Sequence, residues 1–241
     1  MSNIPDFPPY FYEAYRATIK RSPTQALIPI PQTLSEITGP GPAVSAISAE
    51  DTDLTTNMGT GAPAVGERII VTGTVLDENG APVPNTVVEI WQANAAGRYR
   101  HRVDQHHAPL DPNFLGFGKC LTDGSGAYRF TSIRPGAYPW QNHPNAWRPA
   151  HIHFSLFGDS SLARLVTQMY FPGDPLHALD PIFNSVPEGA RDRLIATYDH
   201  DVTMEAWALG FRFDIVLRGP LATPFEAPVT VPGTVEAPTP R

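Results

Sequence analysis

The stretch from Tyr138 to Phe157 holds most of the side chains that could carry out chemistry. It contains a phenol at Tyr138, a guanidinium at Arg148 and two imidazoles at His151 and His153. The two histidines flank one isoleucine at the start of an apolar run, which predicts a strand, and alternate residues of a strand face the same side of a sheet. Two imidazole nitrogens would then converge on one point, and this pattern predicts a metal site. The alternative is a pair of unrelated histidines on a sheet surface.

The elements that position these side chains are predicted to be short strands separated by turns. Runs of β-branched and aromatic residues predict strands at 68–76, 85–91, 117–122, 128–133, 151–157, 164–171 and 206–217. Turn sequences at 77–80 and 123–126 favour hairpins that pair the strand before each turn with the strand after it. Residues 188–198 are the one plausible helix within this region. The pattern predicts an all-β protein with a β-sandwich core and long loops.

Two arms are predicted to flank this core. Residues 1–66 lack strong periodicity apart from a short helix near 10–20, and such a segment rarely folds alone. We therefore predict an N-terminal arm that contacts the core or a partner chain. Residues 67–219 form the predicted catalytic sandwich domain. The proline-rich residues 220–241 are predicted to form an extended C-terminal tail.

The composition limits the classes of partner and location. The chain has 241 residues, 41% hydrophobic and 17% charged, enough to bury a sizeable core. A formal net charge of -7 argues against a nucleic acid or an anionic membrane as partner. We expect no membrane span and a cytoplasmic location, because residues 1–21 lack a signal peptide's apolar core and no apolar run reaches about 18 residues. The single cysteine, Cys120, is expected to be a packed thiol.

Two segments around the histidine pair carry a recognisable signature. Residues 135–140 read Pro-Gly-Ala-Tyr-Pro-Trp and residues 147–154 read Trp-Arg-Pro-Ala-His-Ile-His-Phe, and together they resemble the iron-binding signature of the intradiol ring-cleaving dioxygenases. The resemblance covers most of residues 10–220 and is strongest to the members that act on protocatechuate. In that signature one iron-binding tyrosine precedes the first histidine by thirteen residues and another by about fifty, which correspond to Tyr138 and Tyr99. The resemblance therefore implies four iron ligands: Tyr99, Tyr138, His151 and His153.

The chemistry of these donors agrees with one non-haem Fe(III). A phenolate is a hard anionic oxygen donor and imidazole an intermediate nitrogen donor, whereas zinc sites favour thiolate or imidazole and calcium or magnesium sites favour carboxylate oxygens. Tyrosine, with a pKa of about 10 in water, ionises at neutral pH only beside a strong cation. Two tyrosinates and a hydroxide would neutralise a ferric ion, so the site could be buried without a large desolvation cost.

The resemblance also implies roles for other residues. A catechol would chelate the iron as a dianion, displacing a hydroxide and Tyr138, so that Tyr138 also acts as a catalytic base. Arg148 would stabilise the electron-rich ring carbon, the alternative being a salt bridge that holds the turn at 144–149. Five residues are implied to bind the substrate: Trp140, Gln168 and Ile182 around the ring, and Tyr15 and Arg21 at a ring carboxylate.

The implied function is Fe(III)-dependent intradiol cleavage of protocatechuate (3,4-dihydroxybenzoate) with O2 to 3-carboxy-cis,cis-muconate. This reaction belongs to the β-ketoadipate pathway of aromatic catabolism. The implied partner is a related α subunit without iron, which would form αβ protomers within a higher oligomer.

Three other functions fit parts of the sequence. A catechol or hydroxyquinol 1,2-dioxygenase uses the same four ligands, but it carries a substantial helical N-terminal domain that residues 1–66 are too few and too rich in Pro and Gly to form. A transthyretin-like or carbohydrate-binding sandwich would explain the hairpin pattern at 73–83 but would not need the tyrosines and histidines together. An Fe(II) facial-triad oxygenase would need a carboxylate beside the histidine pair, where Ile152 and Phe154 stand.

Overall fold

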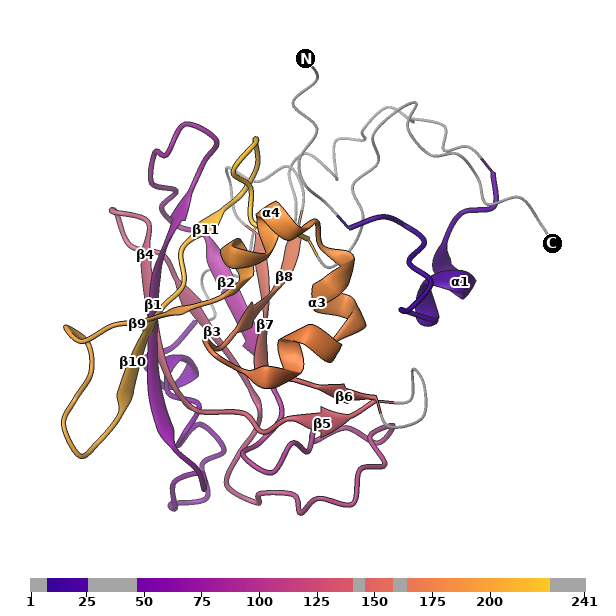
Figure 1. Cartoon of the computed structure of the whole chain (residues 1–241). Coiled ribbons are helices and arrows are strands. Elements are labelled where there is room, and N and C mark those ends of the chain that lie inside the picture. The colour runs from indigo at the N-terminus through magenta and orange to yellow at the C-terminus, as the bar shows by residue number, and fades with distance from the viewer. Residues whose placement is uncertain (1–7, 26–46, 141–145, 158–163, 226–241) are drawn as a thin grey trace.

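Two main β-sheets build the fold in this computed structural model, which describes residues 8–25, 47–140, 146–157 and 164–225 (Figure 1). The first sheet contains β1 (Arg68–Leu76), β4 (Ala127–Ile133), β9 (Thr197–Tyr198), β10 (Leu209–Arg212) and β11 (Ile215–Val216). β1 pairs antiparallel with β4 on one side and parallel with β10 and β11 on the other. The prediction of an all-β fold is confirmed.

The second sheet carries the predicted metal-binding histidines. Its order is β3 (Phe117–Leu121), β2 (Val87–Trp91), β7 (His151–Phe157) and β8 (Leu165–Tyr170), all antiparallel. A separate two-stranded ribbon pairs β5 (Tyr138–Pro139) with β6 (Trp147–Arg148). The short helices are α1 (Ala17–Arg21), η2 (Ala49–Thr52), η3 (Pro175–Leu179), α3 (Pro181–Ser185), α4 (Glu188–Arg191) and η4 (Asp192–Leu194).

The core between the two sheets is apolar. Ile152, Phe154 and Leu156 of β7 contribute to it, each with 0% of its surface exposed, and the ring of Phe154 lies against Phe130 of β4. Full burial of side chains of this size is worth about 1.5–3 kcal/mol each. Cys120 of β3 lies in the same core, where burial raises the pKa of its thiol to about 12. It is a packed thiol, as expected, and not a nucleophile.

The outer face of the second sheet is covered as well. Every residue of β7 except Phe157 is buried, so this strand is enclosed on both faces. Figure 1 shows α3 and α4 beside β8, and β5 with β6 at the lower edge of the sandwich. A second apolar cluster joins β8 to these helices: Tyr170, Phe183, Val186, Ala190 and Leu194. The side chains on the outer face of β7 therefore lie between the sheet and its covering segments.

The predicted hairpins are wrong. β1 and β2 follow each other in the chain but lie in different sheets, and so do β3 and β4. The turn at 77–80 does form, because the amide of Gly80 donates to the carbonyl of Asp77 and Leu76 makes an antiparallel bridge with Pro82. Pro82 and Pro84 have no amide hydrogen with which to extend a ladder, so the chain crosses to the second sheet instead.

The predicted helices and the last strand also differ from the structure. The helix predicted at 188–198 ends as α4 and η4, because β9 then pairs with β10. The strand predicted at 206–217 is divided into β10 and β11, and the helix near 10–20 is shortened to α1. Neither η3 nor α3 was predicted, although each begins at an Asp-Pro pair that supplies the N-cap and the first helical residue.

The segment before the predicted domain boundary also packs on the core where it is described. Leu54 is 0% exposed, and its amide donates to the carbonyl of Thr131 at 2.9 Å. Much of the predicted N-terminal arm, and residues 226–241 of the predicted tail, lie outside the described residues, so both arms stay predictions. In the described ranges no helix is long and apolar enough to cross a membrane.

Candidate metal centre and active site

The alternation of β7 brings the two histidines together. The Nε2 atoms of His151 and His153 lie 3.2 Å apart, and both side chains are buried on the outer face of the second sheet. Their cross-strand neighbours on β8 are Tyr170 and Gln168 respectively. On the other side, the His153 ring stacks on Trp91 of β2 with 4.8 Å between ring centroids. The strand register thus fixes which side chains surround the imidazoles.

Hydrogen bonding selects the tautomer of His151. Its Nδ1 lies 2.7 Å from the carbonyl oxygen of Pro149, which can only accept, so Nδ1 carries the proton and Nε2 presents a lone pair. Burial, followed by the positive charge of Arg148 and the neighbouring His153, lowers the pKa of His151 well below its usual value. The imidazole is therefore neutral at physiological pH, which is the form that binds metals.

Two phenols approach the same point from separate loops. Tyr138 is opposite Arg148 in the β5–β6 ribbon, and its hydroxyl lies 3.3 Å from Nε2 of His151. The ring of Tyr99 meets Tyr138 edge to face at 5.3 Å and lies 6.5 Å from the ring of His153. All four predicted ligands are thus brought together.

The loops that carry the phenols are tied to one another through Asn94. Its side-chain oxygen accepts from the amides of Ala96 and Arg98, and its carbonyl accepts from the amides of Gly97 and Gly136. Gly97 has a φ of 76°, and a Cβ there would lie 2.1 Å from the carbonyl oxygen of Ala137. Only glycine allows the Tyr99 loop to approach the backbone beside Tyr138 this closely.

The donor set fits a ferric ion better than other biological metals. It combines two imidazoles with two phenols, and the described part of the chain has no group of three or more His, Cys, Asp or Glu residues that could hold a metal. The two phenols would complete a four-donor set with the imidazoles, and hard phenolate oxygens match Fe(III).

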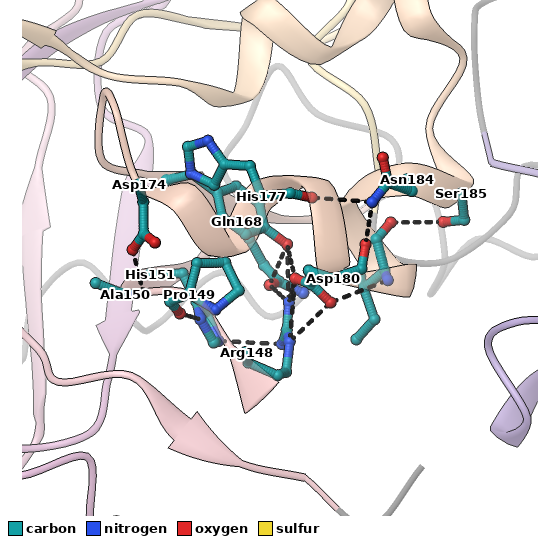
Figure 2. Close-up of polar contacts among 12 residues, drawn as sticks. Arg148, Pro149, Ala150, His151, Gln168, Asp174, His177, Asp180, Asn184 and Ser185 are labelled. Atoms are coloured by element: carbon teal, nitrogen blue, oxygen red, sulfur yellow. Dashed lines mark hydrogen bonds and ion pairs between the residues drawn. The ribbon is translucent and has the colours of Figure 1, made fainter. Parts of the chain in front are cut away.

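A buried ion pair lies directly beside these donors (Figure 2). Arg148 and Asp180, 2% and 0% exposed, form a salt bridge with 2.9 Å between Nη2 and Oδ2. The same Nη2 donates to Oε1 of Gln168 and to the hydroxyl of Tyr170. Burial alone would lower the pKa of Arg148, but Tyr170 and Asp180 raise it well above its usual value. The guanidinium is permanently charged, and its salt-bridge partner lies outside the 144–149 turn.

Sequence reasoning missed Asp180 and Tyr170. Asp180 could have been found from the Asp-Pro pair that starts α3, a helix-start signal. Tyr170 could have been found because it is two residues after Gln168 on a strand and so shares its face. Neither signal identifies Arg148 as the common neighbour.

Four of the five residues predicted to bind substrate have described side chains, and these lie around Arg148 and Trp140. Tyr15 is buried against Trp140, with 5.1 Å between the rings, and Cζ of Arg148 lies 5.9 Å from the centroid of the Trp140 ring. Tyr15, Gln168 and Ile182 line a cavity of about 20 Å³, room for a water molecule and not for an aromatic ring. Arg21 ends α1, and its side chain lies outside the described part of the chain.

Comparison with known proteins defines the class. The family model described as "Dioxygenase" matches residues 37–219, and the model described as "Protocatechuate 3,4-dioxygenase beta subunit N terminal" matches residues 5–33. The chain belongs to the intradiol ring-cleavage dioxygenases, a family of enzymes that use non-haem iron.

Individual relatives define the position within the family. The protocatechuate 3,4-dioxygenase beta chain of Burkholderia cepacia is 60% identical over 92% of this chain and 94% of its own length. The hydroxyquinol 1,2-dioxygenase of Rhizobium sp. is 31% identical over 61% of this chain and 50% of its own length. Among solved structures, 3-chlorocatechol 1,2-dioxygenase from Rhodococcus opacus superimposes with a TM-score of 0.54 at 25% identity, covering 70% of this chain and 65% of that one.

The close approach at Gly97 yields the first prediction. Replacing Gly97 with Ala forces a side chain into left-handed backbone, which costs about 1–2 kcal/mol, and displaces the carbonyl of Ala137 in addition. We expect lower stability together with a lower iron content, because the two phenols move apart. Denaturant unfolding and metal analysis would measure both quantities. Gly124→Ala is the control, since a Cβ at Gly124 meets nothing within 4 Å; equal behaviour of the two variants would contradict the prediction.

Proposed function

We propose that this chain is the iron-bearing subunit of a protocatechuate 3,4-dioxygenase, which cleaves protocatechuate with O2 to 3-carboxy-cis,cis-muconate. The observation that carries the proposal is the convergence of two imidazoles and two phenols beside a buried, permanently charged arginine. The 60% identity to a protocatechuate enzyme, against 31% to a hydroxyquinol enzyme, favours this substrate over the catechol or hydroxyquinol alternative.

One Fe(III) is proposed to be held by Tyr99, Tyr138, His151 and His153. When bound, a ferric ion would supply a Lewis acid that accepts both oxygens of a catechol and withdraws electron density from its ring, so that the ring reacts with O2. The neutral imidazole of His151 and the enclosed position of both histidines suit this role. The two phenols, as phenolates, would balance the charge of the metal within the buried site.

Tyr138 is proposed to leave the metal when the substrate binds and to take up one catechol proton on its phenolate oxygen. It is half-buried and lies on the two-residue strand β5. Tyr99 is proposed to remain bound. Its amide donates to Oδ2 of Asp104 at 2.7 Å, and its loop is held by Asn94.

Arg148 is proposed to stabilise the negative charge that develops on the ring. Its Nη1 lies 3.1 Å from Nε2 of His151, so one end of the cation faces the metal centre. A fixed cation in a site that excludes water is worth more than the same charge in solvent, and it needs no reorganisation during the reaction.

The remaining predicted residues are proposed to bind the substrate. The side-chain amide nitrogen of Gln168 is buried without a hydrogen-bond partner among the described residues, so it could donate to a ligand. Trp140 and Ile182 would form the walls around the ring. Tyr15 and Arg21 would recognise the ring carboxylate.

Colour tests the proposed metal centre. Phenolate bound to Fe(III) absorbs visible light by charge transfer, so protein with a full complement of iron is expected to be red-brown. It should bleach when the iron is reduced or removed by a chelator, and zinc-substituted protein should be colourless. A colourless protein at full iron occupancy would exclude tyrosinate ligation.

The two tyrosines are expected to differ when replaced. Tyr138→Phe should retain iron with altered visible absorption but bind substrate and release product more slowly, because the departing base is lost. Tyr99→Phe should lose iron more severely, because it removes the donor that stays. Iron analysis and stopped-flow substrate binding on both variants would decide, and the opposite pattern would reverse the assigned roles.

Tyr15 is expected to contribute to substrate preference. A hydrogen bond to a charged group is worth about 1.5–3 kcal/mol, so Tyr15→Phe should lower kcat/KM for protocatechuate roughly ten- to a hundred-fold. Its effect on catechol, which lacks the carboxylate, should be small. Tyr12→Phe in the same arm is the control. Equal losses on both substrates would exclude a carboxylate contact for Tyr15.

A related α subunit is the proposed partner, in αβ protomers of a higher oligomer. The support is the relative named as a beta chain and the predicted arms at 1–66 and 220–241, which would suit intertwined subunits. We expect the chain expressed alone to have low activity and co-expression with the α subunit to restore it, as sizing and steady-state assays would show. A fully active lone monomer would contradict the partnership.

A further inference from the structure

Asp180 occupies an unusual position for a fully buried carboxylate. It is the last residue before α3 and the first after η3, so it caps both short helices. Its Oδ1 accepts from the amide of Ile182 at 3.1 Å, and its own amide donates to the carbonyl of Leu176 at 3.0 Å. The backbone of the helix junction thus holds this carboxylate in place.

The same carboxylate binds the Nε and Nη2 edge of the Arg148 guanidinium (Figure 2). Nε lies 3.4 Å from Oδ1 and 3.3 Å from Oδ2, and Nη2 lies 2.9 Å from Oδ2. Nη2 has two hydrogens but three acceptors around it, since Gln168 and Tyr170 also accept from it at 2.6 and 2.8 Å. The Nε and Nη2 edge is therefore fully occupied by protein groups.

The opposite end of the guanidinium, Nη1, has fewer described contacts with protein groups. Nη1 contacts only His151 among the described hydrogen bonds, at 3.1 Å between Nη1 and Nε2. If Nε2 of His151 binds a metal, its lone pair is no longer available and both hydrogens of Nη1 face the metal centre. The planar fork is thereby divided into an anchored edge and a free end.

A carboxylate is needed at Asp180 for an electrostatic reason. Gln168 and Tyr170 supply neutral acceptors, whereas Asp180 supplies the negative charge that a guanidinium with 2% exposure requires. Removing one partner of a buried ion pair leaves the other charge uncompensated, which is strongly unfavourable. Without Asp180 the guanidinium would turn toward other acceptors, and Nη1 would no longer point toward the proposed metal centre.

We propose that Asp180 is a positioning residue that anchors the Nε and Nη2 edge of Arg148, so that Nη1 points at the substrate. Because Asp180 also accepts from the amide of Ile182, it fixes the orientation of Arg148 relative to the pocket wall. This inference rests on the proposed function. Asp180 has no described hydrogen bond to the proposed metal ligands, so its charge acts on the site through Arg148.

Activity in a double-mutant cycle tests the coupling. The variants are Asp180→Asn, Arg148→Ala and the double replacement, each purified as the assembly that the unmodified enzyme forms. We expect Asp180→Asn to lower kcat roughly ten- to a hundred-fold with less change in KM, since the aimed cation acts on charge that develops during the reaction. Iron content and the visible spectrum should stay those of the unmodified enzyme. In the Arg148→Ala background, Asp180→Asn should have no further effect on kcat.

Thermal unfolding gives a readout that does not depend on activity. Each single replacement leaves one buried charge unpaired and should lower the unfolding temperature by roughly 6 °C or more. The double variant removes both charges, so it should unfold at or above the temperature of Arg148→Ala alone. Asp123→Asn is the control, because Asp123 is a turn carboxylate that accepts from the backbone amides of Ser125 and Ala127 and has no described contact with Arg148 or the proposed metal ligands. It should leave kcat unchanged.

The outcomes separate the two proposals. Additive effects of Asp180→Asn and Arg148→Ala on kcat and on unfolding temperature, or a kcat loss explained by lost iron, would show a merely structural role and overturn the positioning role. An unmodified, iron-loaded enzyme without ring-cleaving activity would overturn the proposed function and this inference with it. Non-additive variants of an active enzyme would support both.

Discussion

The structure depends on one strand, β7, that is buried on both faces. Its even-numbered residues fill the core between the sheets, and its odd-numbered residues carry the imidazoles on the outer face. A sheet that left its outer face to solvent would expose the histidines and could not strengthen their electrostatic interactions. The covering segments, which are the β5–β6 ribbon, η3 and α3, convert an exposed His-x-His pair into an enclosed centre, and they also deliver Tyr138, Arg148 and Asp180 to it.

Burial places the positive charge of Arg148 next to the proposed metal site, and neighbouring residues compensate this charge. Arg148 is cationic and lies beside His151, which alone would disfavour a bound cation nearby. Asp180 compensates that charge at 2.9 Å, burial lowers the pKa of His151 and keeps its imidazole neutral, and the carbonyl of Pro149 fixes the tautomer with Nε2 toward the centre. Charge balance is therefore reached within the site, and the proposed phenolates remain available to offset a metal.

The elements that position the site are short and joined by long connections. Asn94 links the Tyr99 loop to the segment before Tyr138 by backbone contacts, and Gly97 permits their close approach. Asp180 does the same for η3 and α3. In each case one buried polar residue satisfies several backbone groups through its side chain and its own backbone, which fixes a segment that has no strand partner of its own. The two proposed phenol ligands thus come from a loop and a two-residue strand whose surroundings are held by specific hydrogen bonds.

Local patterns were sufficient for some features and insufficient for others. The strands at 68–76 and 151–157 and the shared face of His151 and His153 follow from β-branched runs and period-two alternation, which are properties of neighbouring residues. The two predicted hairpin pairings are wrong, because Pro82 and Pro84 end the first hairpin and long-range burial decides which sheet each strand joins. Asp180 lies 32 residues from Arg148, and no local signal links them. Residue types and their local spacing establish most of the long strands and the types of donor atom. Which distant polar groups meet depends on the fold, because a buried polar group needs a partner and the fold sets which partners come within reach.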